Sequence, residues 1–200
     1  MNKVNFNKLS EELIKVGLRI AKRGEGALFV VGEVEHTPLV DQKIPPFKAI
    51  DNPKLLESLA LMDGAVIIDK KGFVSSYGSK IKTTKVFTNY GTRHSAGLSA
   101  SLIKGNTAFV ISEEDRKIRI FKQGKVVIQI DALEKGIEKK VPQINQFLES
   151  LGFGTIGSLS TTAITTTAGI VGISFLPGVI IFASIYLLLK NINSFSKKPQ

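Results

Sequence analysis

The sequence predicts an α/β fold, a mixed β-sheet flanked by helices, followed by a C-terminal hydrophobic helical segment. Before residue 150, segments with apolar residues at helical spacing alternate with short apolar runs of strand length. Two pairs of these runs are separated by hairpin turn signals. No charged residue occurs between Glu149 and Lys190, which marks a change in composition.

The first elements are a helix, a buried strand and a short second helix. Apolar residues recur at helical spacing near the N-terminus, at Leu9, Leu13, Val16 and Ile20. Gly24 and Gly26 end this helix. Residues 27–31 are apolar throughout and predict a fully buried strand. Pro53 is tolerated in the first turn of a helix and begins the second one.

Two hairpins and a central helix follow. Residues 65–68 and 73–77 predict strands joined by the turn at 69–72. A helix led by Thr92 is expected to end near Gly105, before another buried strand at 107–111.

The second hairpin joins residues 117–121 and 126–130 around Gln123-Gly124. Asp131 is then expected to cap a final helical region that Pro142 interrupts.

The composition break divides the chain into four segments. Residues 1–150 are long enough for one domain with its own core. Residues 151–167 predict an uncharged Ser/Thr/Gly-rich linker, residues 168–190 a transmembrane or membrane-embedded helix, and residues 191–200 a basic tail. The alternatives for the apolar segment are a helix buried in a soluble protein, a helical pair in an oligomer, and a re-entrant hairpin that turns at Pro177-Gly178.

Composition excludes some classes of site. The 200 residues include no cysteine and two histidines, so disulfides, thiolate metal sites and multi-histidine zinc sites are excluded. The formal net charge of +10 suits anionic partners such as nucleotides, or is a solvated lysine-rich surface. Nucleic acid is not expected as a partner, since no motif of a nucleic-acid-binding fold accompanies the charge.

A candidate anion site lies at the predicted start of the central helix. Thr92, placed as the N-cap, offers its hydroxyl to the free N–H groups of the helix, and Gly91 lets the backbone approach a ligand closely. Arg93 adds a planar fork that matches phosphate oxygens. Ordinary helix capping explains the same residues without a ligand.

Carboxylates at two predicted strand ends are candidates for holding a metal. Asp63 precedes Gly64 and a buried strand, and Glu113 follows another buried strand at Ser112. Mg²⁺ and Mn²⁺ prefer a few carboxylates completed by phosphate oxygens and water. Turn chemistry is the alternative for both acids. Tyr77 is a candidate for stacking on a base, with packing at a sheet edge as its alternative.

These motifs, taken in order, resemble those of the diadenylate cyclase domain family, known from DNA-integrity scanning proteins and membrane-bound cyclases. The resemblance covers roughly residues 10 to 130. It is carried mainly by Asp63-Gly64-Ala65, by Gly91-Thr92-Arg93-His94 and by Ser112-Glu113-Glu114.

The family implies condensation of two ATP molecules into cyclic di-AMP, with release of two pyrophosphates, by two ATP-loaded domains that face each other. The implied partners are therefore ATP and a second copy of the chain, as a homodimer or higher homo-oligomer. The implied cofactor is a divalent metal, Mn²⁺ or Mg²⁺. We expect the protein at the cell membrane, held by its C-terminal segment, with the catalytic domain in the cytoplasm.

The resemblance also implies roles for individual residues. Asp63, Arg93 and His94 are expected to be catalytic, and Asp63, His94 and Glu113 to bind the metal. The residues expected to bind the nucleotide are Gly64, Ala65, Tyr77, Gly91, Thr92, Arg93, Ser95 and Ser112.

One departure bears on activity. The family's usual motif is Arg-His-Arg, and Ser95 stands where the second arginine is expected. The phosphate clamp therefore has one positive charge fewer. The alternative function is a catalytically weak or inactive module that binds ATP or cyclic di-AMP.

Overall fold

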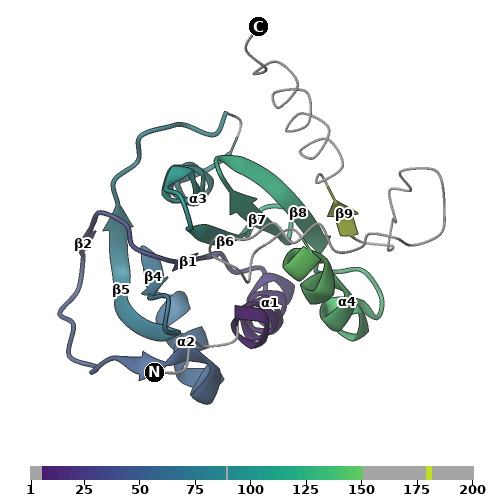
Figure 1. Ribbon diagram of the computed structural model, residues 1–200, viewed down its shortest axis with the longest axis horizontal. Helices are drawn as coiled ribbons and strands as arrows, with labels where there is room; N and C mark the ends of the chain where they lie inside the picture. Colours follow the sequence, from purple (N-terminus) through teal and green to yellow (C-terminus); the bar gives the residue numbers. More distant parts are fainter. Residues whose placement is uncertain (1–5, 89, 151–178, 182–200) are drawn as a thin grey trace, which may run out of the picture.

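The structure is a computed structural model that describes residues 6–88, 90–150 and 179–181. Figure 1 shows one twisted sheet with helices packed on it. The helices are α1 (Phe6–Lys22), η1 (Ala49–Asp51, a 3₁₀ turn), α2 (Pro53–Ala60), α3 (Thr92–Leu102) and α4 (Ile137–Ser150). The strands are β1 (Ala27–Val31), β2 (His36–Pro38), β3 (Phe47–Lys48), β4 (Ala65–Ile68), β5 (Phe73–Ile81), β6 (Thr107–Ile111), β7 (Lys117–Lys122), β8 (Lys125–Asp131) and β9 (Val179–Ile181).

The sheet is mixed. Within the described residues its strands lie in the order β2-β5-β4-β1-β6-β7-β8-β9, and β3 pairs with β5. β1 is parallel to β4, and the other pairs are antiparallel. The predicted fold class of the domain, a mixed sheet flanked by helices, is therefore confirmed.

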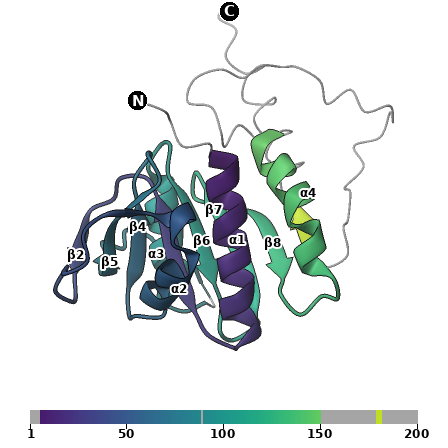
Figure 2. The same ribbon diagram turned by 90° about the horizontal axis from the view of Figure 1, so that it is seen from below.

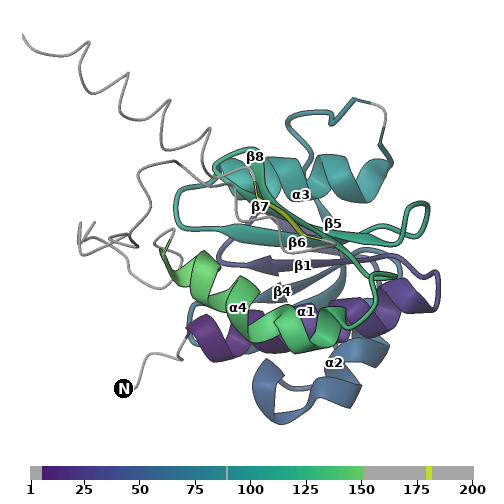
Figure 3. The ribbon, with the colours of Figure 1, turned by 90° about the vertical axis from the view of Figure 1, so that its right-hand side faces the viewer.

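Helices cover both faces of the sheet. Figure 3 shows α3 on one face and α1, α2 and α4 on the other, and Figure 2 shows α1 and α4 side by side. The buried residues form two clusters, one for each face. Phe29 of β1 lies in the α1 cluster, whereas its neighbours Leu28 and Val30 lie in the α3 cluster. A strand buried on both faces is apolar throughout, as residues 27–31 are.

Two short strands were not predicted from the sequence. β2 and β3 have three and two residues, contain no apolar run, and pair with β5. β5 extends to Ile81, beyond the predicted end at 77. These elements depend on hydrogen bonds to a neighbouring strand, which no local pattern reports.

The prediction for the last helix was wrong in two respects. Asp131 ends β8, and its Oδ1 accepts the N–H of Leu133 at 2.9 Å, which forms a turn and not a helix cap. Pro142 does not interrupt α4, which continues through it to Ser150. Val141 and Ile144 on either side of the proline are buried, so packing offsets the hydrogen bond that the proline cannot make.

Part of the predicted C-terminal helix is a strand. Val179–Ile181 form β9, which pairs antiparallel with β8, and Val179 is buried in the α1 cluster. β-branched residues suit a strand, and β8 supplies the unpaired edge that they extend. The remainder of 168–190, the 151–167 linker and the 191–200 tail lie outside the described residues. In the part of the chain that the structure describes, no helix combines the length and hydropathy that crossing a bilayer requires.

Candidate functional site

The predicted site residues gather at one end of the sheet. Ala27 at the start of β1 pairs with Ile111 at the end of β6, so Gly26 and Ser112 lie at the same end. β1 and β4 are parallel, with Phe29 beside Val66. Asp63, two residues before β4, therefore lies at the same end of the sheet as Gly26. The topology therefore collects segments 63–65 and 112–114 beside the start of β1.

Helix α3 brings the Arg93 motif to the same end. The helix lies close to the sheet at Gly97, where an added Cβ would be 2.4 Å from Cγ2 of Val110. Arg93 then donates from Nη1 to Oε2 of Glu113 at 3.2 Å. A Cβ at Gly26 would lie 2.6 Å from Nη1 of Arg93. Arg93, Glu113 and the backbone of Gly26 are thus in contact, although 20 or more residues separate them along the chain.

Asp63 is exposed and available to a ligand. Its Oδ1 accepts the N–H of Gly64 at 2.9 Å, and among the described residues its carboxylate forms no ion pair. Gly64 has a φ of +99°, and an added Cβ would lie 2.5 Å from the backbone nitrogen of Ser79. Glycine is therefore required by both backbone conformation and close approach. Gly64 thereby fixes the backbone beside Asp63, just before the start of β4, and Ala65 after it is buried.

The N-cap of α3 is Gly91 and not Thr92, which corrects the prediction. The carbonyl of Gly91 accepts the N–H of His94 at 3.1 Å and that of Ser95 at 3.4 Å. Thr92 is the first residue of the helix, and no side chain caps it. Gly91 and Thr92 are exposed, so this first turn remains a place for an anion.

His94 is buried, in contrast to its expected contact with the triphosphate and a metal. Its side chain is 2% exposed, and its Nε2 lies 3.2 Å from Nη1 of Arg119. A guanidinium nitrogen can only donate, so Nε2 accepts and its lone pair is engaged. The ring also packs against Tyr90, with centroids 4.8 Å apart. His94 therefore supports the helix start from inside the protein.

The environment of His94 lowers its pKa. Burial is the largest cause, the Arg119 charge adds to it, and the carboxylates of Glu114 and Asp115 act in the opposite direction. Burial would raise the pKa of Asp115, but its hydrogen bonds and the charge of Arg119 outweigh this and lower it.

We expect acid to destabilise the fold through these groups. His94 and Asp115 each have a lower pKa in the folded state than in the unfolded state, so the unfolded state binds protons more readily. Each group therefore adds to the free energy of unfolding above its unfolded pKa, and this contribution is lost as the pH falls. The His94 contribution decreases below its ordinary pKa of 6.5, and that of Asp115 decreases below 3.8. Urea unfolding at about pH 7 and about pH 5 measures the first effect. A His94→Asn variant should show a smaller decrease across this interval; an unchanged decrease would exclude His94 as its source.

Two serines of the predicted site bond within the protein. Oγ of Ser95 accepts the N–H of Phe87 at 3.0 Å, and Ser95 is buried. Ser95 thereby holds the preceding loop against α3, and its expected contact with nucleotide stays a prediction. Oγ of Ser112 donates to Oε2 of Glu114 at 2.7 Å. This hydrogen bond is the largest cause of the lowered pKa of Glu114.

Tyr77 lies on the opposite face of the sheet from α3. It is 5% exposed and belongs to the α1 cluster. Its hydroxyl donates to the carbonyl of Asp41 at 3.2 Å and accepts the N–H of Ile44 at 3.1 Å. A buried ring offers no face to a nucleobase, so packing, the alternative reading of Tyr77, describes its place.

The three predicted metal ligands are not gathered into one group in the described residues. Among residues 6–88, 90–150 and 179–181, no three His, Asp or Glu side chains come close enough to hold a metal ion. His94 is engaged by Arg119, whereas Asp63 and Glu113 are exposed carboxylates at the same end of the sheet. Two hard oxygen donors completed by phosphate and water fit Mg²⁺ or Mn²⁺. Metal binding by Asp63, His94 and Glu113 stays a prediction, and Asp63 and Glu113 are the two of them that are exposed.

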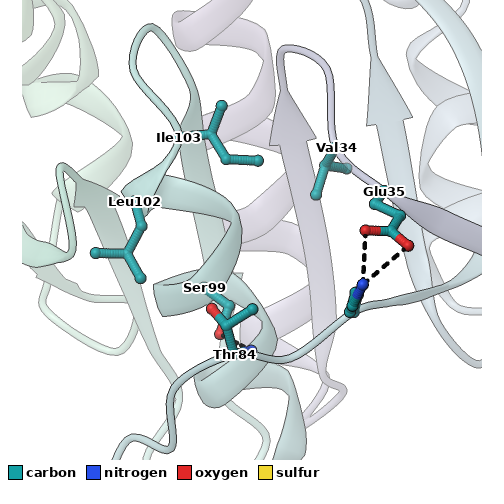
Figure 4. Close-up of a pocket in the computed structure, with 7 residues that line it drawn as sticks. Val34, Glu35, Thr84, Ser99, Leu102 and Ile103 are labelled. Atoms are coloured by element: carbon teal, nitrogen blue, oxygen red, sulfur yellow. Dashed lines mark hydrogen bonds and ion pairs between the residues drawn. The ribbon is translucent and has the colours of Figure 1, made fainter.

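A cavity of about 200 Å³ lies elsewhere, at the C-terminal end of α3. Figure 4 shows its lining, which includes Val34, Leu102 and Ile103 and the ion pair of Glu35 with Lys82. None of the predicted site residues lines it. The candidate site at the start of α3 is thus separate from this cavity.

Sequence reasoning missed Arg119, Asp115 and Tyr90, which pack behind the site. Arg119 alternates with Ile118 and Ile120 along β7, a pattern that also describes a solvent-exposed face. Phe121 lies two positions after Arg119 and so on the same face of the strand. This aromatic residue was the available signal that the face is covered.

The fold is that of an α/β domain, and a family comparison identifies its class as nucleotide-binding. The model of the DAC family, described as DisA bacterial checkpoint controller nucleotide-binding, matches residues 17–126, more than half of the chain. The chain therefore belongs to this family, as the motifs had indicated.

Curated relatives carry names consistent with the family. The chain is 28% identical over 139 residues to a diadenylate cyclase of Haloferax volcanii, an alignment that covers 60% of this chain and 51% of the relative. It is 31% identical over 119 residues to the cyclic di-AMP synthase CdaS of Bacillus subtilis. That alignment covers 56% of this chain and 58% of the relative. The chain thus spans about half the length of the curated relatives that it matches.

Solved structures are also similar. A double mutant of DacA from Staphylococcus aureus aligns over 74% of this chain and 97% of its own, with 22% identity and a TM-score of 0.48.

Proposed function

We propose that the protein is a diadenylate cyclase, which condenses two ATP molecules into cyclic di-AMP and releases two pyrophosphates. The observation that carries the proposal is the meeting of Arg93, Glu113 and Gly26 at the exposed start of α3, with Asp63 before β4 at the same end of the sheet. The family match and the names of the relatives support the same activity.

Each site residue has a proposed role in the reaction. Arg93 and the free N–H groups of the first turn of α3 bind triphosphate oxygens and offset their negative charge. Asp63 orients the ribose 3′-hydroxyl and accepts its proton. Asp63 and Glu113 would hold a divalent metal, which would supply further charge stabilisation at the phosphates. Most of the acceleration then comes from positioning the two reactants.

Glu113 and Arg93 must exchange partners when ATP binds. In the structure Arg93 donates to Glu113, and both side chains are partly exposed. A triphosphate is the stronger partner for the guanidinium because it presents several charged oxygens. Its arrival would release Glu113 as an oxygen donor.

The chemistry requires two copies of the site. Each ATP supplies one 3′-hydroxyl nucleophile and one α-phosphate to be attacked, so two loaded domains must face each other. The start of α3 is open to solvent, as this meeting requires. We accordingly propose a homodimer or higher homo-oligomer as the active form.

Product analysis tests the function. The full chain incubated with ATP and Mn²⁺ or Mg²⁺ should yield cyclic di-AMP and pyrophosphate. Binding of ATP or cyclic di-AMP without product would favour the alternative, a non-catalytic binding module. The place of Ser95 favours that alternative, since it adds no charge to the phosphate site and bonds to Phe87. If the chain neither forms the product nor binds nucleotide, both functions are contradicted.

A variant at Gly26 tests the binding of phosphate by Arg93. In Gly26→Ala the new methyl group would lie 2.6 Å from Arg93 and 3.1 Å from Oε2 of Glu113, so these side chains must move. We expect ATP affinity, measured by calorimetry, to fall about tenfold, the equivalent of one charge-assisted hydrogen bond. Gly105→Ala, at the far end of α3 with open space around it, is the control and should keep its affinity. Equal affinities would mean that the guanidinium of Arg93 moves aside from the methyl group and still reaches ATP.

Membrane attachment through residues 168–190 stays a prediction. Fractionation of cells that express the full chain, followed by extraction with alkaline carbonate, measures it. A chain held by the segment should remain with the lipid pellet, and release by carbonate would contradict attachment by insertion.

A further inference from the structure

Arg119 is a buried charge on the face of the sheet that α3 covers. It lies on β7 between Val110 of β6 and Gln129 of β8, and its side chain is 4% exposed. A guanidinium stays charged in a protein, so its burial is costly unless its N–H groups are satisfied. Its partners therefore indicate what it organises.

Three separate segments supply these partners. Asp115, in the loop after β6, accepts from Nη1 at 3.1 Å and also from Nη2, so the pair is bidentate. His94, in the first turn of α3, accepts from Nη1 at 3.2 Å. Tyr90, in the loop before α3, lies over the guanidinium with its ring centroid 4.7 Å from Cζ.

The same three segments carry the residues of the nucleotide site. Tyr90 immediately precedes Gly91, His94 follows Arg93, and Asp115 is two residues after Glu113. We propose that Arg119 is a positioning residue of this site, which fixes the start of α3 relative to the loop after β6. This inference rests on the proposed function. Arg119 itself is buried and does not contact the nucleotide.

The arrangement of donors makes the role specific to arginine. One planar guanidinium reaches Asp115 with two nitrogens while one of them also faces His94. A lysine ammonium keeps the charge for Asp115 but does not reproduce this fork. The contact also sets the ring of His94, since an accepting Nε2 leaves the proton of the neutral ring on Nδ1.

The test compares Arg119→Met and Arg119→Lys with the wild type in the full chain. We expect Arg119→Met to lower kcat about tenfold or more, because small displacements of reacting groups are costly, while KM for ATP changes less than about threefold. Arg119→Lys should recover thermal stability more fully than kcat. Arg116→Met is the control, because that exposed arginine bonds to the carbonyl of Lys22 and should keep the wild-type kcat.

A second readout needs no nucleotide. Long-range ¹H–¹⁵N spectra should show His94 of the wild type as the Nδ1–H tautomer, and Arg119→Met should lose this preference. A wild-type kcat in folded Arg119→Met, or in Arg119→Lys if the methionine variant does not fold, would overturn the inference, as would an unchanged tautomer. A wild type that makes no cyclic di-AMP would contradict the proposed function, whereas the tautomer would still decide whether Arg119 orders this turn.

Discussion

Asp63→Asn is expected to lower the rate of cyclic di-AMP formation at least about a hundredfold, the usual contribution of a positioned acid–base group. The amide neither accepts the proton of the ribose hydroxyl nor supplies a charged oxygen to a metal. The fold should not change, because Asp63 is exposed and an amide oxygen can still accept the N–H of Gly64. Rates of product formation, followed by chromatography, measure the loss.

The matched control is Asp51→Asn, which removes another exposed carboxylate at the end of η1, outside the site. It should retain the wild-type rate. Equal rates for the two variants would show that Asp63 has no special role. For both, the unfolding free energy should stay within about 0.5 kcal/mol of the wild type, as for most surface substitutions.

Gly64→Ala is expected to have the largest effect on stability, a loss of about 3 kcal/mol in the free energy of unfolding, from backbone strain and overpacking together. The backbone has a φ of +99°, and the new Cβ would lie 2.5 Å from the nitrogen of Ser79 and 2.8 Å from the carbonyl carbon of Gly78. Backbone atoms of a paired strand cannot move aside as a flexible side chain does. Urea unfolding at neutral pH measures the loss.

Gly105→Ala separates strain from collision. Its φ of +91° is close to that of Gly64, but an added Cβ meets nothing within 4 Å. We expect this variant to lose about 1 kcal/mol, the strain alone. Similar losses at both positions would mean that the β4–β5 contact adjusts to the methyl group and does not require glycine.

Strands that are buried on both faces could be predicted from sequence with their bounds. Residues 27–31, 65–68 and 107–111 form strands as expected, because a short run of apolar residues without a polar face is typical of a central strand. The start of α3 at Thr92 was also expected, but its cap was not. Capping depends on which carbonyl closes the first turn, and here it is that of Gly91.

The face on which Tyr77 lies could not be predicted. β5 pairs with β4 through two register shifts, and the glycine after Tyr77 has a φ of +50°. Val74 and Tyr77 therefore share a cluster although three positions separate them, which a regular strand does not allow. The irregularity that places Tyr77 away from the α3 face results from the pairing of β5 with β4. The local pattern of apolar residues does not report it.

The sequence by itself determined the alternation of elements, the family and the motif residues that flank the start of β1, since these are properties of local composition and spacing. Only the tertiary structure decided which motif residues reach the surface. Arg93, Asp63 and Glu113 are accessible there, whereas His94 and Ser95 turn inward to Arg119 and Phe87. Neighbouring residues on a helix point in different directions, and the sheet that α3 covers determines which of them are buried.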